Sequence, residues 1–455
     1  MRETFDRDPA LRLPASYKYG VGYLGGTATQ QNRAQIYAVS DGVAWHRDGP
    51  GSPAMALPPD IAEHWQLDLY LNPVGFLKAA AMPGADPVAF WRWELGEMGR
   101  DGPTTIPEKV RVISIKVLDK YQVDATINRE NLIQRIHTSI AHPVMGDFNV
   151  EQEFVNEEYA DLGNGMRFPT TWHSHQGVDD NFGAQFVSSG HNAFDGTLDD
   201  ITVNDCAEEV AVPASLARWP DPAVVESQEL ADGVYLLGGG THNSVAVEFE
   251  DYIAVVEAPL NEERSLAVIE EVVRLIPDKP VRFLVNTHQH WDHIGGMRTY
   301  MHIGATTITH WKNTEFYNSD VLNYTPRTVE PDLVSLAPPT EVAEGYFLEE
   351  LRENYTPADG DRIMRINYVH PLEHAEGMLM VYLPNERLLI EADLFDTHEP
   401  FPDEPTEAAQ DAVQTLFDNV NTLGYRVDRI VPIHGAPVTW SEFLTATGVE
   451  GQPTE

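Results

Sequence analysis

The sequence VNTHQHWDHIGG at residues 285–296 places three histidines and one aspartate within six positions. It continues the apolar run RFLVN (282–286), which predicts a buried strand, and it ends in a glycine pair that predicts a turn. The four potential ligands are His288, His290, Asp292 and His293. Side chains that follow a buried strand so closely are expected to converge beyond its end. Imidazole and carboxylate groups at this density suit zinc or iron.

Around this stretch, short apolar runs with β-branched residues alternate with helical patterns, which is typical of an α/β arrangement. Six further runs predict strands: SVAVEF (244–249), YIAVVE (252–257), ATTITH (305–310), MLMVYL (378–383), RLLIE (387–391) and RIVPIH (429–434). The sequence therefore predicts a sheet-rich C-terminal domain with the histidine cluster at a strand end.

Two helices are expected among these strands, over residues 261–276 and 407–423. Asn261 is the expected N-cap of the first, and acidic residues fill its first turn, where the helix dipole favours anions. One face is expected to be apolar, with Leu266, Ile269, Val273 and Ile276. Gly424 is expected to close the second helix.

HQHWDH at 288–293 resembles the His-x-His-x-Asp-His signature of the metallo-β-lactamase superfamily. Later motifs of that family appear in order: His374 with Gly377 before a strand, Asp393 at the end of the next strand, and His434 followed by Gly435. His370 lies four residues before His374, but the spacing to Asp393 favours His374 as the ligand.

This resemblance implies an αββα sandwich over residues 226–455 and seven metal ligands. One metal would be held by His288, His290 and His374, the other by Asp292, His293 and His434, and Asp393 would bridge both. Two zinc ions are expected, with iron or manganese as alternatives. The chain departs from the family pattern with Glu257 in place of an aspartate, with Glu373 and Ala375 around the third motif, and with Ala392 before the bridging position.

Such a ligand set implies a hydrolase. Two cations about 3.5–4 Å apart lower the pKa of a shared water towards 7, so that a bridging hydroxide attacks an ester, lactone or amide-like bond. Asp292 is expected to orient this nucleophile or to protonate the leaving group. Two alternatives remain: a diiron redox enzyme on the same fold, and a non-catalytic ligand-binding protein. No Gly-x-Ser-x-Gly elbow supports a serine hydrolase.

Further residues are candidates for substrate contacts. His242 lies in the glycine-rich turn GGGTHNSV, and Tyr317 and Tyr324 lie in a long segment between His310 and Arg362. That segment is either a lid facing the substrate or a helical excursion without a role, and aromatic residues in it either contact substrate or pack it down. The pair His173 and His175 shares a strand face, which more often faces solvent than binds metal.

The first half of the chain follows a different pattern. Runs between residues 110 and 177 show strand alternation with turn residues between them, which predicts an antiparallel meander, and one helix is expected over 73–82. Prolines and acidic residues mark 206–225 as a linker. We therefore expect an α+β protein in which a mainly antiparallel domain (1–205) precedes the catalytic domain. The first domain would bind an extended or apolar substrate, form a homodimer or cover the catalytic domain.

The composition narrows the partners. With 71 acidic and 30 basic residues among 455, the net charge is −41, which disfavours nucleic acid and favours a small neutral substrate. Cys206 is the only cysteine, so the metal must be held by histidine and carboxylate. No stretch reaches the length of a membrane helix and the start lacks a signal-peptide core, so a soluble protein is expected, with cytoplasm and periplasm both open as compartments.

Overall fold

The computed structural model divides into two compact units, each considered by itself below. Unit 1 comprises Met1–Gly22, Thr27–Trp219 and Thr328–Glu330, and unit 2 comprises Tyr23–Gly26, Pro220–Arg327 and Pro331–Glu455. The structure describes residues 2–5, 35–47, 52–57, 59–95, 98–99, 102–103, 107–144, 146–154, 158–177, 191–198, 201, 203, 211–216, 223–322, 327–336, 348–372, 374–398 and 400–449. Most of the linker expected at 206–225 lies outside these residues, and so does Tyr324.

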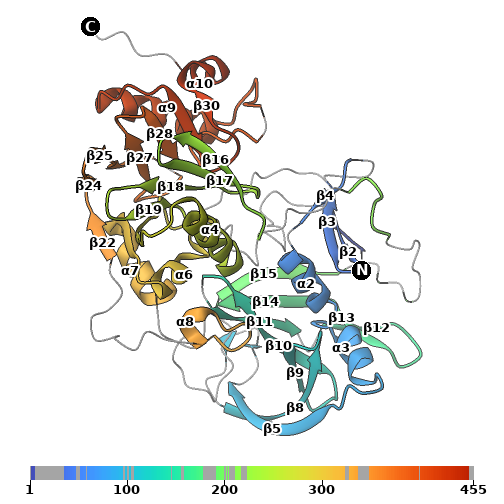
Figure 1. The fold of residues 1–455 in the computed structure, drawn as a ribbon. Helices are drawn as coiled ribbons and strands as arrows, with labels where there is room; N and C mark the ends of the chain where they lie inside the picture. Colours follow the sequence, from blue (N-terminus) through green and yellow to red (C-terminus); the bar gives the residue numbers. More distant parts are fainter. Residues whose placement is uncertain are drawn as a thin grey trace. The chain divides into compact units, whose positions relative to one another are not determined.

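Unit 1 is built on an antiparallel sheet of seven strands in the order β15-β14-β11-β10-β9-β8-β5 (Figure 1). Its strands are β5 (Val88–Leu95), β8 (Pro107–Val117), β9 (Tyr121–Ile127), β10 (Ile133–His142), β11 (Gly146–Phe154), β14 (Thr171–Gly177) and β15 (His191–Thr197). Strands β8 to β11 follow one another in chain order, each paired antiparallel with the next. The antiparallel meander expected from the alternation is confirmed.

The described residues of unit 1 include the helices α2 (Pro59–Asp68) and α3 (Pro73–Ala80). The second confirms the helix expected at 73–82: the side chain of Asn72 accepts a hydrogen bond from the amide of Gly75, and proline occupies its first turn. The smaller strands are β1 (Arg2–Phe5), β2 (Gln35–Ser40), β3 (Val43–Arg47), β4 (Met55–Ala56), β6 (Met98–Gly99), β7 (Gly102–Pro103), β12 (Tyr159–Asp161) and β13 (Arg167–Pro169).

Unit 2 contains two larger sheets. The first has the order β16-β17-β18-β19-β20-β21-β22, with β16 (Glu226–Ala231), β17 (Val234–Gly238), β18 (Ser244–Glu248), β19 (Ile253–Val256), β20 (Val281–Val285), β21 (Thr306–His310) and β22 (Leu348–Leu351). The second has the order β23-β26-β27-β28-β29-β30, with β23 (Asn354–Tyr355), β26 (Arg365–Tyr368), β27 (Leu379–Leu383), β28 (Leu388–Glu391), β29 (Arg429–Pro432) and β30 (Val438–Thr439). A short hairpin joins β24 (Ala358–Asp359) to β25 (Arg362–Ile363).

The two sheets pack face to face through one apolar core, in which Val247 and Val285 of the first sheet meet Val381 and Ile390 of the second. On the outer face of the second sheet lie α9 (Glu407–Thr422) and α10 (Trp440–Thr447), packed through a separate apolar cluster that includes Leu416. Because helices cover the sheets that share this core, unit 2 is the αββα sandwich that the resemblance implied.

Helix α4 (Glu262–Leu275) begins as expected, with Asn261 accepting a hydrogen bond from the amide of Arg264. Its buried face was predicted only in part. Ile276 is buried as expected, but Leu266 and Val273 are 41% and 53% exposed, and the buried residues of the helix are Arg264, Ser265, Val268 and Val272. The expected stripe lies one position away from the true inner face, which Val268 and Val272 share with a buried arginine.

The described residues between His310 and Arg362 combine short helical turns with strands. They form the short helical turns η1 (Trp311–Asn313), α7 (Thr314–Phe316), η2 (Tyr317–Val321) and α8 (Leu333–Leu336) before strand β22. This strand pairs parallel with β21 and so extends the first sheet. Among the described residues, no helix combines the length and apolar composition needed to cross a bilayer.

Candidate metal centre

The histidine signature occupies the loop that leaves strand β20 and the short helix α5 (Trp291–Ile294) that follows it. Much of this segment is buried: Asn286, Thr287, His288 and His293 are all inaccessible to solvent. The loop is fastened to the neighbouring strands, because the amide of Asn286 donates to Ile308 and the carbonyl of Thr287 accepts from Leu379. The two sheets therefore both hold the loop that carries the signature.

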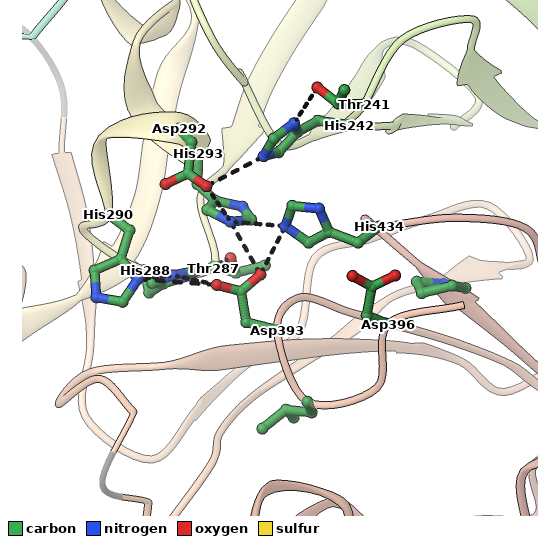
Figure 2. A network of polar contacts seen from close by, with 12 residues as sticks. Thr241, His242, Thr287, His288, His290, Asp292, His293, Asp393, Asp396 and His434 are labelled. Carbon is green, nitrogen blue, oxygen red and sulfur yellow. Dashed lines mark hydrogen bonds and ion pairs between the residues drawn. The ribbon is translucent and has the colours of Figure 1, made fainter. Parts of the chain in front are cut away.

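One set of four donors comprises His288, His290, His374 and Asp393, whose potential ligand atoms all lie within 4.8 Å of one another. We call it the His374 group. Oδ2 of Asp393 lies 2.9 Å from Nε2 of His374 and 3.3 Å from Nε2 of His288. Nδ1 of His290 lies 2.8 Å from Nε2 of His288, so both imidazoles aim a nitrogen at the same point (Figure 2).

A second set comprises His242, Asp292, His293 and His434, again with potential ligand atoms within 4.8 Å. We call it the His434 group. Nε2 of His434 lies 3.3 Å from Nε2 of His293, and Oδ2 of Asp292 lies 3.2 Å from Nε2 of His242. The structure thus brings all seven residues assigned by the resemblance into two adjoining groups. It adds His242, which was expected only as a substrate contact.

Asp393 lies between His288 and His290 on one side and His293 and His434 on the other (Figure 2). Its Oδ2 faces the His374 group, while its Oδ1 lies 2.9 Å from Nε2 of His434 and 3.1 Å from Nε2 of His293. The residue has a φ of 60°, in the left-handed region that non-glycine residues seldom adopt. Oε2 of the buried Glu391 accepts hydrogen bonds from the amides of Leu394 and Phe395, which fixes this turn and the position of the carboxylate.

Glu257, which stands where the family pattern has an aspartate, uses both of its carboxylate oxygens in hydrogen bonds. It is completely buried, its Oε2 lies 2.7 Å from Nδ1 of His293, and its Oε1 accepts the amide of Thr287 at 2.7 Å. Because Nδ1 of His293 is occupied in this way, Nε2 is the nitrogen presented to Asp393 and His434. The longer side chain thus orients one imidazole and the signature loop together.

Arg264 is the residue that sequence reasoning missed. Its guanidinium is buried, and Nη2 donates to the carbonyls of Leu237 and Gly238, while Nη1 donates to Val224. These bonds hold the turn that leads to His242, which Asn243 also fastens by donating to Pro432 and Gly435. The signal was available, because Arg264 lies on the stripe of Val268 and Val272 at helical spacing.

Electrostatics within the cluster favour neutral His288 and His242, ionised carboxylates and, in the absence of a cation, a protonated His293. Burial and the neighbouring His293 lower the pKa of His288, and burial and His434 lower the pKa of His242 to about 4. Burial alone would raise the pKa of Asp393, but His293 and His288 hold it well below its usual range. Burial would lower the pKa of His293, but Asp393, Asp292 and Glu257 raise it well above the usual value.

These residues fit a divalent cation. Metal ligands must be deprotonated, and the lowered pKa values of His288 and Asp393 keep their donor atoms free of protons. Oδ1 of Asp393 is buried and accepts no hydrogen bond of good geometry, although two imidazole nitrogens lie close to it. Imidazole nitrogens crowded around a buried carboxylate are the donor chemistry that zinc, iron and manganese accept.

The other candidates fall outside the two groups. His370 is exposed and belongs to neither, so the choice of His374 agrees with the geometry. Tyr317 is completely buried and its hydroxyl donates to Asn286, which gives it the packing role named as the alternative to substrate contact. His310 stacks on Tyr368 with ring centroids 4.1 Å apart, as a packing residue would.

The exposed residues Asp396 and His398 also place potential ligand atoms within 4.8 Å of His434, and the sequence did not indicate this third group.

Comparisons with known proteins agree with this architecture. Residues 237–434 match the family model described as the metallo-beta-lactamase superfamily, in agreement with the resemblance seen in the sequence. Among curated proteins, the linear primary-alkylsulfatase of Pseudomonas sp. (strain ATCC 19151) is 23% identical over 233 residues, which cover 43% of this chain and 42% of that protein. The chain thus matches less than half the length of this relative.

Two solved structures illustrate the similarity. The metallo-beta-lactamase from Pontibacter korlensis is 16% identical with a TM-score of 0.38, covering 50% of this chain and 98% of that one. The DIM-1 metallo-beta-lactamase is 13% identical with a TM-score of 0.35, covering 49% of this chain and 95% of that one.

Proposed function

We propose that the C-terminal unit is a two-metal hydrolase that cleaves an ester-type bond. One observation carries the proposal: the carboxylate of Asp393 directs Oδ2 to the His374 group and Oδ1 to the His434 group. A carboxylate with one oxygen towards each of two donor sets suits the bridging position between two cations. A site built for one structural metal would have a single closed ligand set, which these eight residues do not form.

In this proposal, His288, His290 and His374 hold one cation, Asp292, His293 and His434 hold the other, and Asp393 contacts both. A bound pair of divalent cations lowers the pKa of water towards about 7 and so supplies a hydroxide at neutral pH. Zinc is the metal we expect, with iron or manganese as alternatives that the same donors accept.

The protein's own contribution is orientation and charge. Glu257 accepts from Nδ1 of His293 and so presents Nε2 of that ring to the site. Asp292 keeps 28% of its side chain exposed, unlike the buried His288 and His293, so it is the carboxylate that reaches a bound substrate. We assign to Asp292 the orientation of the nucleophile or the proton transfer to the leaving group.

The substrate class expected from the sequence is a small neutral ester, lactone or amide. A second candidate is the sulfate ester of a primary alkyl chain, favoured by the similarity to the linear primary-alkylsulfatase. Both chemistries need a polarised oxygen and an activated water, and the donor groups provide for either. What differs is the charge of the substrate, so direct competition between neutral and anionic esters separates the two.

The test combines metal analysis with a substrate panel. The full chain is purified, its metals are quantified, and hydrolysis of aryl esters, lactones, β-lactams and a primary alkyl sulfate is measured before chelation, after it and after restoring zinc. We expect about two zinc ions per chain and hydrolysis that disappears on chelation and returns with zinc. Two irons per chain, a visible absorption band and no hydrolysis would instead establish the redox alternative, and ligand binding without turnover would establish a binding protein.

A further inference from the structure

Unit 1 contains a pocket of about 420 Å³ between helix α3 and the antiparallel sheet. Its lining includes Leu77 of the helix, Trp91 of β5, Arg111 and Ile113 of β8, and Ile127 of β9. Ligand pockets in proteins are typically about 300–1,000 Å³, so this one is large enough for a small molecule. The pocket lies within unit 1 and includes no residue of the candidate metal centre.

The strand register explains why these side chains share one face. Trp91 is paired with Arg111, Arg111 with Ile127, and Ile127 with Ile133, which forms one row across four neighbouring strands. Residues paired directly across a sheet point to the same side. The row therefore presents an aromatic ring, a guanidinium and two aliphatic side chains to the pocket.

The pocket adjoins an unusual concentration of exposed apolar side chains. Between residues 77 and 93, six large hydrophobic side chains are at least 38% exposed: Leu77, Met82, Val88, Phe90, Trp91 and Trp93. Single exposed apolar residues are ordinary, and Val88 and Phe90 lie on the opposite face of β5, but Trp91 and Trp93 share the face of Arg111 and, with Leu77 beside the pocket, indicate a binding surface there.

The polar part of the pocket is cationic. Arg111 donates from Nη2 to Oδ1 of Asn131 at 2.7 Å and to the carbonyl of Asn128, and within the described residues it has no carboxylate partner. Its Nε and Nη1 donors remain available, since a guanidinium carries several N–H groups. Arg167 also lines the pocket, 3.5 Å from the exposed carboxylate of Glu130, and Lys109 lies over the ring of Trp91.

From this combination we infer that the pocket binds an amphiphile with a single alkyl chain and an anionic head group. The alkyl chain would lie along Leu77, Trp91 and Ile113, and the head group would accept hydrogen bonds from Arg111 and Arg167. A guanidinium matches the geometry of carboxylate, sulfate and sulfonate oxygens equally, so the inference concerns their shared chemistry. It does not depend on the proposed hydrolase activity.

The test is calorimetric titration of the full chain, depleted of metal, with decanesulfonate and decanoate below their micellar concentrations. Neither ligand contains a hydrolysable ester, so binding is measured apart from turnover. We expect saturable binding of one anion per chain, with decyltrimethylammonium at least tenfold weaker because its charge is opposite. The stronger of the two anions identifies the preferred head group.

Two variants locate the site. Ala89→Trp places a large ring on the exposed position paired with Ile113 and should weaken binding at least tenfold by filling the pocket. Arg111→Gln should weaken both anions roughly tenfold, the effect of losing hydrogen bonds to a charged group, while leaving the binding of decanol unchanged. Lys116→Gln is the matched control, since this exposed lysine lies on the same strand but on the opposite face.

Several outcomes would overturn the inference: no saturable binding of either anion, equal binding by Ala89→Trp, or equal affinity for decyltrimethylammonium. A second copy of the chain is the competing occupant of the exposed apolar surface. It would be indicated if Ala89→Trp dissociated a dimer in analytical ultracentrifugation while the parent bound no amphiphile. Asp393→Asn should bind decanesulfonate as the parent does. The binding test can therefore succeed or fail independently of the hydrolase proposal.

Discussion

The His374 group contains Asp393 and the His434 group contacts it, but one histidine in each group is supported differently. In the His434 group, the ring of His293 is completely buried and its second nitrogen is held by the buried Glu257. In the His374 group, 30% of the His374 side chain is exposed, and its closest polar contact is Asp393 itself. His293 is therefore fixed by the protein interior, whereas His374 faces solvent on one side.

This difference indicates how each group contributes. A buried donor with a buried carboxylate behind it is already oriented, so binding costs little reorganisation. A half-exposed donor can move, and it leaves space beside the site for a substrate. We therefore expect the His434 group to determine how tightly its cation is held, and the open side near His374 to determine what approaches.

The largest expected effect comes from the shared residue. Asp393→Asn keeps the size of the side chain and removes the charge that both groups contact, so metal affinity should fall roughly 10- to 100-fold or more. Turnover should fall at least as far, because the reaction needs both cations. Metal content after dialysis and hydrolysis rates measure the two effects. Two metals and full activity in this variant would show that Asp393 is not the bridging residue.

The next effect tests a buried ion pair outside the two donor groups. Burial would raise the pKa of Asp332, but hydrogen bonds from Arg298 on α6 (Met297–His302) and from Ser335 lower it to about 2. The folded pKa lies below the ordinary 3.8, so this stabilisation is fully present above about pH 4 and is lost as pH falls through about 2. Its magnitude is about 2 kcal/mol.

Asp332→Asn should therefore lower the free energy of unfolding by about 2 kcal/mol at pH 7, and the difference from the parent should shrink as pH falls from about 4 to about 2. Urea unfolding at several pH values measures this. Asp428→Asn is the control, because that aspartate is exposed and lies 3.6 Å from an exposed arginine. A difference that stays constant with pH would contradict the role of the charge.

A smaller effect sharpens the contrast between the groups. Glu257→Gln leaves one side-chain oxygen to serve both Nδ1 of His293 and the amide of Thr287, so one of the two contacts is lost. We expect about tenfold weaker binding of one metal and an unchanged second metal. Competition with a chelator, following one equivalent at a time, measures this. The control Glu271→Gln on α4 should leave both metal affinities unchanged. Equal losses of affinity at both metals in Glu257→Gln would contradict a role of Glu257 at one metal only.

The smallest effect concerns His242, whose Nε2 contacts Asp292. If His242 contacts substrate, as expected from the sequence, His242→Ala should keep both metals and raise KM severalfold, with kcat changed less. Steady-state kinetics and metal content together decide this. Loss of one metal would instead make His242 a ligand of the His434 group.

Much of unit 2 could be predicted from the sequence because its signals are local. An apolar run such as RFLVN forms a strand in any sheet, and the spacing within HQHWDH follows directly from the chain. The later motifs were found through the family resemblance, and the sandwich it implied is the one observed. Asn261 capped its helix as expected, because an N-cap depends only on the next three residues.

The failures depend on partners distant in the chain. The helical spacing places Arg264 on the stripe of Val268 and Val272, but only the fold supplies the carbonyls of Leu237 and Gly238 that allow an arginine to be buried there. The burial of Tyr317 depends on Asn286, and the second contact of Glu257 depends on the amide of Thr287. In each case, hydrogen bonds across strands decided whether a polar side chain lies inside.

The sequence by itself determined which residues supply the chemistry: the histidines and aspartates of the motifs and a chain without thiolate clusters. Only the tertiary structure decided how they divide into two groups, that Asp393 lies between them, and that His242 joins one. The physical reason is that the sequence gives the type of each donor side chain, whereas the convergence of donors from separate strand ends depends on how the two sheets pack.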